Sequence, residues 1–235
     1  MSLRGIDISN HQGDNGFNLG AVKDEIDFVI CKATGGNYFV DDYCDGFIMQ
    51  AKLYGLPWGF YHFGNDGLYS EPEEEADFFI ENCRNYFKDG IPILDWETDY
   101  IDIDWVNRFV RKVHNETGVW PWIYGNAWRF TSEVEQNCGR WVASYPSSLL
   151  YPPLDVELPE EPECNGLMCA WQFASDGRLN GYSGNLDFNV FYGDAVAWKK
   201  YAQGDVNEET YDDIVEKLYE SKDFDIDLVW HRYYS

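Results

Sequence analysis

Short apolar segments alternate with amphipathic segments through the first half of the chain, and this alternation restricts the folds that are open to it. Each apolar segment is rich in β-branched and aromatic residues and is bounded by Gly, Pro or Asp, which is typical of a buried strand. Strands that alternate with helices form βα units and a parallel sheet. The predicted strands of this half are Gly5–Ser9, Asp27–Lys32, Pro57–Phe63, Ile91–Glu97 and Pro121–Gly125.

Amphipathic helices are predicted between these strands. In the first of them, apolar residues recur at the helical spacing i, i+3, i+4, i+7, and Gly55 stands at the C-cap position. A second begins with the capping box that Ser70 forms with Glu73, and a third ends at Gly118. Their apolar faces consist of Cys44, Phe47, Ile48 and Ala51; of Ala76, Phe79, Ile80, Cys83 and Phe87; and of Trp105, Phe109 and Val113.

The second half of the chain adds strands without regular crossover helices. A proline-rich stretch from Tyr145 to Glu163 excludes a long helix there, and the link between the last two strands is too short for one. The strands are Arg140–Tyr145, Cys169–Ala174 and Leu186–Phe191. Together with the βα units these strands are enough to close a barrel. We therefore expect an α/β fold, an irregular TIM-like β/α barrel of roughly (β/α)5β3 type.

The composition changes after Gln203. Residues 204–235 contain ten acidic residues against three basic ones, but one amphipathic helix is still predicted there, with Asn207 as its N-cap. We expect two parts: a catalytic β/α barrel of residues 1–203, and an acidic C-terminal helical extension or linker of residues 204–235. The apolar face of the extra C-terminal helix consists of Tyr211, Ile214, Val215 and Leu218.

The net charge limits the partners of this chain. With 17 Lys and Arg against 42 Asp and Glu, the formal net charge is −25, so a nucleic-acid binder that neutralises phosphates is excluded. No segment contains the ~20 uninterrupted apolar residues of a membrane span. Residues 1–4 lead directly into a strand, so no signal peptide with an apolar segment and a cleavage site is visible.

The cysteines predict neither a metal site nor a cofactor. None forms a C-x-x-C pair or lies beside histidine at zinc-finger spacing. Cys31 lies in a predicted buried strand, and Cys44 and Cys83 lie on apolar helix faces, which favours packing roles. Only Cys164 and Cys169, on either side of a loop, are candidates for a disulfide.

Carboxylates stand where several predicted strands end, which is the edge at which β/α barrels carry their chemistry. Asp7 ends the first strand, Asp95 and Glu97 end the fourth, and Asp187 lies in the last. Residues i and i+2 of a strand share a face, so the inward option places Asp95 and Glu97 in one site. Like charges there raise one pKa and hold the other down, which provides a protonated acid beside an ionised carboxylate, as in glycosidases.

A structural interpretation of these acids stays open at this point. In a chain with 42 acidic residues, a D-x-E triplet on an exposed strand face is common by chance. The barrel context favours a site for Asp95 and Glu97. Asp7 and Asp187, each taken alone, are as typical of strand-end caps or salt-bridge partners as of catalytic groups.

Aromatic residues near the same edge suit a carbohydrate ligand, because sugar rings stack their C–H faces on aromatic rings. Tyr61 and His62 end the third strand, Tyr124 ends the fifth and Trp171 lies in the seventh. Because 18% of the chain is aromatic, packing is the more common role for any one of these residues. His62 is more typical of a hydrogen-bonded core residue than of a base.

Eight segments carry motifs that occur together in this chain: Gly5–Gly13, Cys31–Thr34, Gly59–Phe63, Leu94–Glu97, Trp122–Gly125, Trp141–Tyr145, Trp171–Phe173 and Gly184–Asn189. Taken together, these segments resemble the Chalaropsis-type lysozymes, glycoside hydrolase family 25. The motifs occur in the family's order from residue 5 to residue 191, and their joint occurrence is specific. The resemblance implies an irregular barrel and an N-acetylmuramidase, which cuts the β-1,4 bond between N-acetylmuramic acid and N-acetylglucosamine in peptidoglycan.

The resemblance also implies roles for individual residues. Glu97 is the expected general acid. Asp95 beside it either stabilises positive charge or orients the substrate's acetamido group for attack on the anomeric carbon, with net retention. Asp7 and Asp187 match the family's other site acids. One departure is Gly35, where many relatives have an acidic residue. The positions that line the family's substrate groove match Lys32, Tyr61, Tyr124 and Trp171.

The resemblance predicts an enzyme that acts on peptidoglycan at the cell wall or outside the cell, without a metal or cofactor. It reaches the wall with a leader that has been removed or through a phage holin. Two alternatives stay open. One is a non-catalytic glycan-binding barrel, which the Asp95 and Glu97 pair disfavours. The other is a hydrolase of chitin or another acetamido-sugar polymer, which product analysis distinguishes.

Overall fold

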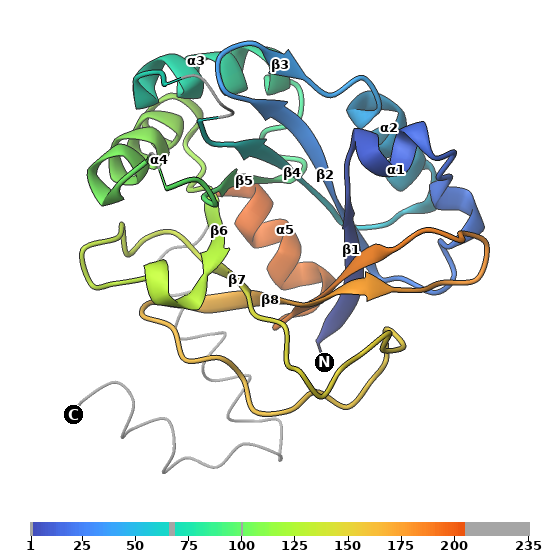
Figure 1. The fold of residues 1–235 in the computed structure, drawn as a ribbon. Coiled ribbons are helices and arrows are strands. Elements are labelled where there is room, and N and C mark those ends of the chain that lie inside the picture. Colours follow the sequence, from blue (N-terminus) through green and yellow to red (C-terminus); the bar gives the residue numbers. More distant parts are fainter. Residues whose placement is uncertain (1, 66–68, 100, 205–235) are drawn as a thin grey trace. The chain divides into compact units, whose positions relative to one another are not determined.

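The computed structural model describes residues 2–65, 69–99 and 101–204, and eight strands in these ranges close into a barrel (Figure 1). The ring order is β1-β9-β8-β7-β6-β5-β4-β2, and β1 pairs with β2 to close it. The predicted barrel is thus confirmed. The strands are β1 (Leu3–Ile8), β2 (Phe28–Gly35), β4 (Trp58–Phe63), β5 (Ile91–Asp95), β6 (Trp122–Asn126), β7 (Arg140–Ala143), β8 (Met168–Gly177) and β9 (Leu186–Phe191), with β3 (Phe39–Val40) folded back on β2.

The links between the strands differ in part from the predicted (β/α)5β3 pattern. In the described ring, neighbouring strands are parallel except at β9, which runs antiparallel to β8 and β1. Crossover helices precede β4, β5 and β6, whereas β1 is followed by a five-residue helix and β6 by a 3-10 turn. The exact pattern is therefore not confirmed. The helices are α1 (Asn10–Asp14), α2 (Cys44–Tyr54), α3 (Pro72–Cys83), α4 (Ile103–Thr117) and α5 (Ala195–Gln203), and the 3-10 turns are η1 (Leu19–Ala21) and η2 (Ala127–Arg129).

The ends of the helices follow local sequence signals with one exception. Gly55 ends α2 and Gly118 ends α4 in the left-handed region, with φ of 70° and 75°, as their C-cap positions predict. The capping box predicted at Ser70 is wrong. Pro72 occupies the first position of α3, so Ser70 lies too far upstream to cap the helix, and its hydroxyl donates to the Glu75 carboxylate instead. None of the helices in the described ranges is both long and apolar enough to cross a bilayer.

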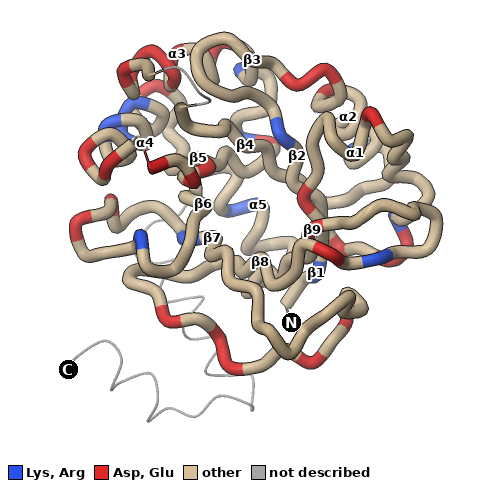
Figure 2. Tube along the Cα trace, viewed as in Figure 1, with Lys and Arg blue, Asp and Glu red and all other residues tan. Residues whose placement is uncertain are grey.

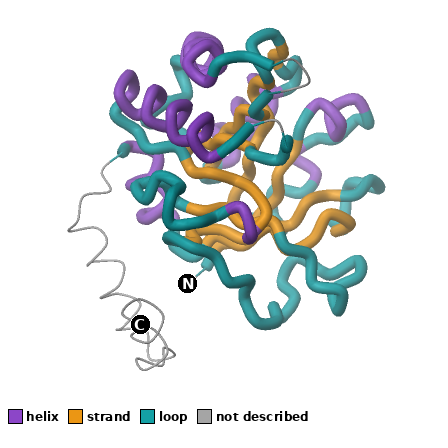
Figure 3. The backbone as a smooth tube through the Cα atoms, turned by 60° about the vertical axis from the view of Figure 1, so that its left-hand side comes forward, coloured by secondary structure: helices purple, strands orange, loops and turns teal. Residues whose placement is uncertain are grey.

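Two apolar layers stabilise the barrel, one inside the ring and one between the ring and the surrounding helices. Figure 3 shows the strands in the middle with the helices outside them. Successive side chains of a strand point to opposite faces, so each strand contributes to both layers. The inner layer includes Phe28, Ile91, Trp122, Trp141 and Phe191, and the outer layer includes Ile6, Val29, Phe60, Phe79 and Phe109.

Helix α5 lies across the ring of strands at the edge where the parallel strands begin (Figure 1). Its Trp198 ring lies 4.7 Å from Phe28 and 5.6 Å from Trp122, centroid to centroid. The Trp198 indole also donates to the carbonyl of Trp58, 3.0 Å away. The opposite edge, where the strands end, is left open. Helix α5 was not predicted from the sequence. The predicted C-terminal extension of residues 204–235 lies, from residue 205 on, outside the described residues.

All six cysteines fall within the described ranges, and all are free thiols. The disulfide considered for Cys164 and Cys169 is therefore wrong. β8 places Cys169 in the inner layer, where its Sγ lies 3.2 Å from the carbonyl oxygen of Arg140, whereas Cys164 packs against the outer layer. The two side chains face different layers, so they do not meet. The cysteines predicted for the core are buried: Cys31, Cys44 and Cys83.

Charged residues pair across α3 and α4, where basic and acidic segments lie side by side (Figure 2). Arg108 of α4 lies 2.6 Å from Glu73 and 3.0 Å from Glu71. Lys112, one turn further, lies 2.9 Å from Asp77 of α3. These side chains are at the surface, where such pairs contribute little to stability. They lie apart from the open edge of the barrel.

Candidate active site

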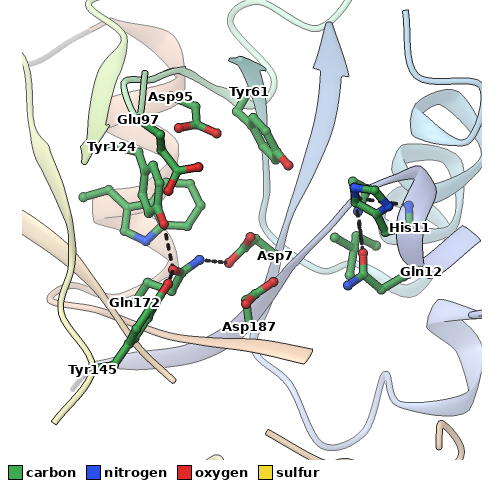
Figure 4. Close-up of a pocket in the computed structure, with 13 residues that line it drawn as sticks. Asp7, His11, Gln12, Tyr61, Asp95, Glu97, Tyr124, Tyr145, Gln172 and Asp187 are labelled. Carbon is green, nitrogen blue, oxygen red and sulfur yellow. Dashed lines mark hydrogen bonds between the residues drawn. The ribbon is translucent and has the colours of Figure 1, made fainter. Parts of the chain in front are cut away.

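A cavity of about 250 Å³ opens at the edge where the parallel strands end (Figure 4). This is the edge at which β/α barrels place their reactive side chains, because loops of variable length follow each strand there. Polar and aromatic side chains from most strands of the ring meet in it. The cavity is lined by Asp7, Ile8, Ser9, His11, Gln12, Tyr61, Asp95, Glu97, Tyr124, Trp141, Tyr145, Gln172 and Asp187.

The four carboxyl groups expected from the sequence all line this cavity. Asp7 comes from β1 and Asp187 from β9, and the two residues are direct partners in the register of these strands. Asp95 is the last residue of β5. Glu97 follows the end of this strand, so the strand is shorter than predicted, but both acids still face the cavity (Figure 4).

Asp7, which is buried, and Asp187, which is half-buried, are neighbouring carboxyls on β1 and β9. Burial raises the pKa of Asp7 to about 7, although hydrogen bonds from Asn189 and Gln172 oppose the rise. Burial and the nearby Asp7 raise the pKa of Asp187 to about 8. Because two like charges in one buried place are unfavourable, the pair keeps a proton to a higher pH than two exposed aspartates.

Two amide side chains hold Asp7 in place, and neither of them was predicted as a site residue from the sequence. Gln172 Nε2 and Asn189 Nδ2 each donate to Asp7 Oδ2 at 2.8 Å. The other end of Asn189 accepts from the Trp141 indole, also at 2.8 Å. The signal was present in the sequence: each amide interrupts an apolar strand, and a buried polar group needs a partner.

Tyrosine hydroxyls complete the network around Gln172. Tyr124 donates to Gln172 Oε1 at 2.8 Å, and Tyr145 donates to the same oxygen (Figure 4). Tyr124 lines the cavity as expected, and Tyr145 was not predicted there. Because the amide donates to Asp7 and accepts from both tyrosines, its orientation is fixed.

Asp95 and Glu97 differ in their surroundings. Asp95 is 6% exposed, and its Oδ1 has no hydrogen-bond partner among the described residues. Burial raises its pKa well above the usual value, with a further rise from Glu97 and an opposing effect of Lys32. Glu97 is exposed at the mouth of the cavity, where partial desolvation raises its pKa and Tyr124, Arg129 and Lys32 oppose the rise.

Two residues expected in the groove do not line the cavity. Trp171 is fully buried, and its indole donates to the Ser144 carbonyl at 2.7 Å. Side chains alternate along β8, so the strand that turns Gln172 inward turns Trp171 to the outer layer. Lys32 is half-buried on β2, with Nζ 5.0 and 4.9 Å from the ring centroids of Phe39 and Phe63.

His62 is a core residue, as its position in a buried strand predicted. Its ring is fully buried, with Nδ1 2.9 Å from Thr34 Oγ1 and Nε2 2.9 Å from Glu75 Oε2. Glu75 also accepts from the main-chain N–H of Asn65 at 2.8 Å. This network ties α3 to the loop after β4 and lies outside the cavity. Among the described residues, no group of three or more His, Cys, Asp or Glu is suited to hold a metal ion.

The family of the chain follows from its similarity to a known family of proteins. The model of the glycosyl hydrolases family 25 matches residues 6–182. The chain belongs to this family. The resemblance drawn from the sequence motifs is confirmed, and with it the class of glycoside hydrolases.

Two relatives of this family 25 chain and one solved structure are named as lysozymes. The autolytic lysozyme of Clostridium acetobutylicum is 28% identical over 199 residues, which are 80% of this chain but only 56% of that protein. Lysozyme M1 of Streptomyces globisporus is 28% identical over 215 residues, which are 83% of this chain and 69% of that protein. The bacterial lysozyme from Streptomyces coelicolor has the same fold, with a TM-score of 0.70 at 26% identity over 86% of this chain and 97% of that one.

Proposed function

We propose that this chain is an endo-acting N-acetylmuramidase, which hydrolyses the β-1,4 bond between N-acetylmuramic acid and N-acetylglucosamine in peptidoglycan strands. The observation that carries the proposal is the meeting of Asp7, Asp95, Glu97 and Asp187 in one cavity at the open edge of a family 25 barrel. The names of the lysozyme relatives support the same substrate. The place of action is then the bacterial cell wall.

Glu97 is the general acid of this proposal. A general acid must carry a proton at the working pH, and desolvation in the cavity mouth raises the pKa of Glu97 above the usual glutamate value. It must also reach the bond that breaks. Glu97 is exposed while Asp95 lies buried beside it, so Glu97 is the acid that a glycan strand in the open groove meets first.

Asp95 orients the substrate's own acetamido group. Its carboxyl lines the cavity, and because its Oδ1 has no hydrogen-bond partner among the described residues, the protein does not prevent it from turning to accept from the acetamido N–H of a bound sugar. The acetamido oxygen then attacks the anomeric carbon as the glycosidic bond breaks and Glu97 protonates the leaving oxygen. Water, which gives its proton to the ionised Glu97, attacks the same carbon and opens the oxazoline ring with net retention. Substrate assistance of this kind replaces the enzyme nucleophile of most retaining glycosidases.

Aromatic side chains in the cavity offer the stacking surface that sugar rings use. Tyr61, Tyr124, Trp141 and Tyr145 line it together with the carboxyls. Asp7 and Asp187 lie side by side on β1 and β9. Once this carboxyl pair is ionised, it stabilises the positive charge that develops on the sugar.

The first test is mass spectrometry of the borohydride-reduced fragments that the protein releases from purified peptidoglycan. Wild type, Glu97→Gln and the matched control Glu133→Gln are digested side by side, since Glu133 is an exposed loop acid away from the cavity. We expect new muramitol ends from wild type and Glu133→Gln, and at least ~10³-fold fewer from Glu97→Gln. NMR of the first product should show the β-anomer.

Other results would contradict specific parts of the proposal. Glucosaminitol ends would keep a hydrolase but assign it to the other bond. An α-anomer as the first product would exclude acetamido assistance. Absence of release by folded wild type from several wall types would favour a glycan-binding barrel, or a hydrolase of chitin or another acetamido-sugar polymer.

A further inference from the structure

Arg129 is a buried arginine next to the cavity, and neither the sequence motifs nor the family match gives it a role. It ends η2, the 3-10 turn that follows β6, and it is 7% exposed. Arginine is almost never buried to this degree unless its donors are paired. β5 and β6 are parallel neighbours, so η2 lies at the same edge as Glu97.

The segment that carries Glu97 leaves the sheet just before this residue. β5 ends at Asp95, and the main-chain N–H of Trp96 still donates to the Tyr124 carbonyl of β6 at 2.9 Å. Glu97 and Thr98 lie beyond that bond. Their carbonyl groups need other partners, because strand pairing no longer supplies them.

The guanidinium of Arg129 supplies the hydrogen bonds that strand pairing no longer provides to these carbonyl groups. Its Nη2 donates to the carbonyl oxygen of Glu97 at 2.8 Å, and its Nη1 lies 3.4 Å from the carbonyl oxygen of Thr98. The same Nη2 lies 2.8 Å from Asp99 Oδ1. One planar group thus contacts three successive residues, and a planar fork of this kind holds its acceptors in a fixed geometry.

Two indole rings hold the guanidinium itself. Its central carbon lies 5.3 Å from the ring centroid of Trp96 and 4.7 Å from that of Trp128, within the range of cation–π contacts. Trp96 is buried, and its indole donates to the Ile101 carbonyl at 3.1 Å. Arg129 is therefore a fixed anchor rather than a mobile surface side chain.

We propose that Arg129 is a positioning residue for Glu97: it binds the main-chain carbonyls of Glu97 and Thr98 and the side chain of Asp99, and so fixes the position of the Glu97 carboxyl at the cavity. The inference rests on the proposed acid role of Glu97 and adds a residue to it. Main-chain anchoring matters for a general acid, because a displacement of about 1 Å from the productive geometry costs about a hundredfold in rate.

The charge of Arg129 acts on Glu97 as well. Lys32 and Arg129 favour the ionised form of the Glu97 carboxyl. A neutral residue at position 129 therefore raises the pKa of Glu97, and the acid stays protonated to a higher pH. The titratable and charged groups that face Glu97 are Asp7 from β1, Lys32 from β2, Asp95 from β5, Tyr124 from β6, Arg129 from η2, Tyr145 from the loop after β7 and Asp187 from β9.

The test compares Arg129→Lys with Arg129→Gln. Lysine keeps the charge but loses the fork, and glutamine loses both. Initial rates are measured on soluble, uncross-linked peptidoglycan oligomers from pH 4 to pH 9, together with thermal unfolding and near-UV circular dichroism. Arg108→Lys and Arg108→Gln are the matched controls, because Arg108 is a half-exposed arginine of α4 that pairs with Glu71 and Glu73 at the start of α3, away from the cavity.

We expect both Arg129 variants to be folded and to lose about tenfold in kcat, with KM within about twofold of wild type. The alkaline limb of the pH profile should move up by about half a pH unit in Arg129→Gln and stay in place in Arg129→Lys. The Arg108 variants should match wild type. A wild-type kcat in either Arg129 variant, or an unmoved limb in Arg129→Gln, overturns the inference.

A second readout separates this inference from the proposed function. Carbon-13 NMR of the glutamate side-chain carboxyls, with Glu97 assigned through Glu97→Gln, gives its pKa without any substrate. If wild type proves inactive on peptidoglycan, the proposed function fails. A higher Glu97 pKa in Arg129→Gln than in wild type then still supports the contact, and identical titrations overturn it.

Discussion

At the scale of single residues, the environment of each acid in the cavity is set by the side chains on neighbouring strands. Asp7 Oδ2 receives N–H groups from β8 and β9, whereas Asp95 Oδ1, buried to a similar degree, receives none among the described residues. An oxygen with two donors is held in place, whereas an oxygen without donors is not fixed by the protein. Two aspartates of the same cavity, Asp7 and Asp95, are therefore suited to different roles.

The buried amide of Asn189 should be costly to remove. Asn189→Leu keeps the number and branching of side-chain heavy atoms but takes one donor from Asp7 and leaves the Trp141 indole without an acceptor. We expect a loss of about 2 kcal/mol in the free energy of unfolding, because buried polar groups left unpaired are penalised. Urea unfolding at pH 5 measures it.

Asn180→Leu is the matched control for this substitution. Asn180 is exposed and donates to Glu25 at 3.1 Å on the surface, so its loss should change the free energy of unfolding by less than about 0.5 kcal/mol. Equal losses in the two variants would argue that the amide next to Asp7 has no special energetic role.

At the scale of elements, α5 fills the barrel at the edge where the parallel strands begin. The helix begins with Asp194 as N-cap, whose carboxylate accepts from the N–H groups of Val196 and Ala197. It presents Trp198 and Tyr201 to the inner layer of the ring. The cavity at the opposite edge is therefore closed at its inner end by packed side chains and does not pass through the barrel.

Removal of the Trp198 ring should destabilise the whole barrel. Trp198→Ala deletes contacts with Phe28, Trp122 and Phe191 and leaves a cavity in the inner layer. The expected loss is about 3–5 kcal/mol in the free energy of unfolding. Val196→Ala, on the exposed side of the same helix, should cost less than about 0.5 kcal/mol. Denaturant unfolding of both variants measures the difference, and a loss near 1 kcal/mol for Trp198→Ala would contradict this account of α5.

At the scale of the whole molecule, the cavity concentrates acids that would be more stable apart. Residues far apart in sequence, such as Asp7 and Asp187, become direct neighbours when β9 pairs with β1. Their repulsion and desolvation are unfavourable to folding and are retained at the site, as is common where a protein keeps reactive groups close together.

This arrangement predicts how stability depends on pH. The pKa of Asp187 in the folded chain is about 8, above the ordinary value of 3.8, so the folded state binds more protons than the unfolded state between these values. The free energy of unfolding should therefore fall as the pH rises from about 4 to about 8. Asp187→Asn removes the repulsion and should stabilise the protein by about 1–2 kcal/mol at pH 8, but little at pH 4.

Thermal unfolding at a series of pH values checks this prediction, with Asp24→Asn as control, since Asp24 is an exposed acid that pairs with Lys23 at the surface. Parallel pH curves for wild type and Asp187→Asn would show that the carboxyl pair does not control the pH dependence.

The sequence by itself determined the barrel, its strands and the acids of the cavity. Strand and helix periods, turn residues and cap glycines such as Gly55 act over a few residues, so they are readable without the fold. Leu186–Phe191 is the same strand in prediction and structure. Glu97 and Asp95 were found because parallel strands end at one edge.

The tertiary structure alone decided which side chains meet there. Whether Trp171 or its neighbour Gln172 faces the cavity depends on the register of β8 against its partners, and a shift of one residue reverses it. Asn189 and Arg129 became significant only when strands far apart in sequence closed the ring and brought them to Asp7 and Glu97. Local patterns specify elements, whereas contacts between distant segments specify the site, because those contacts exist only in the closed barrel.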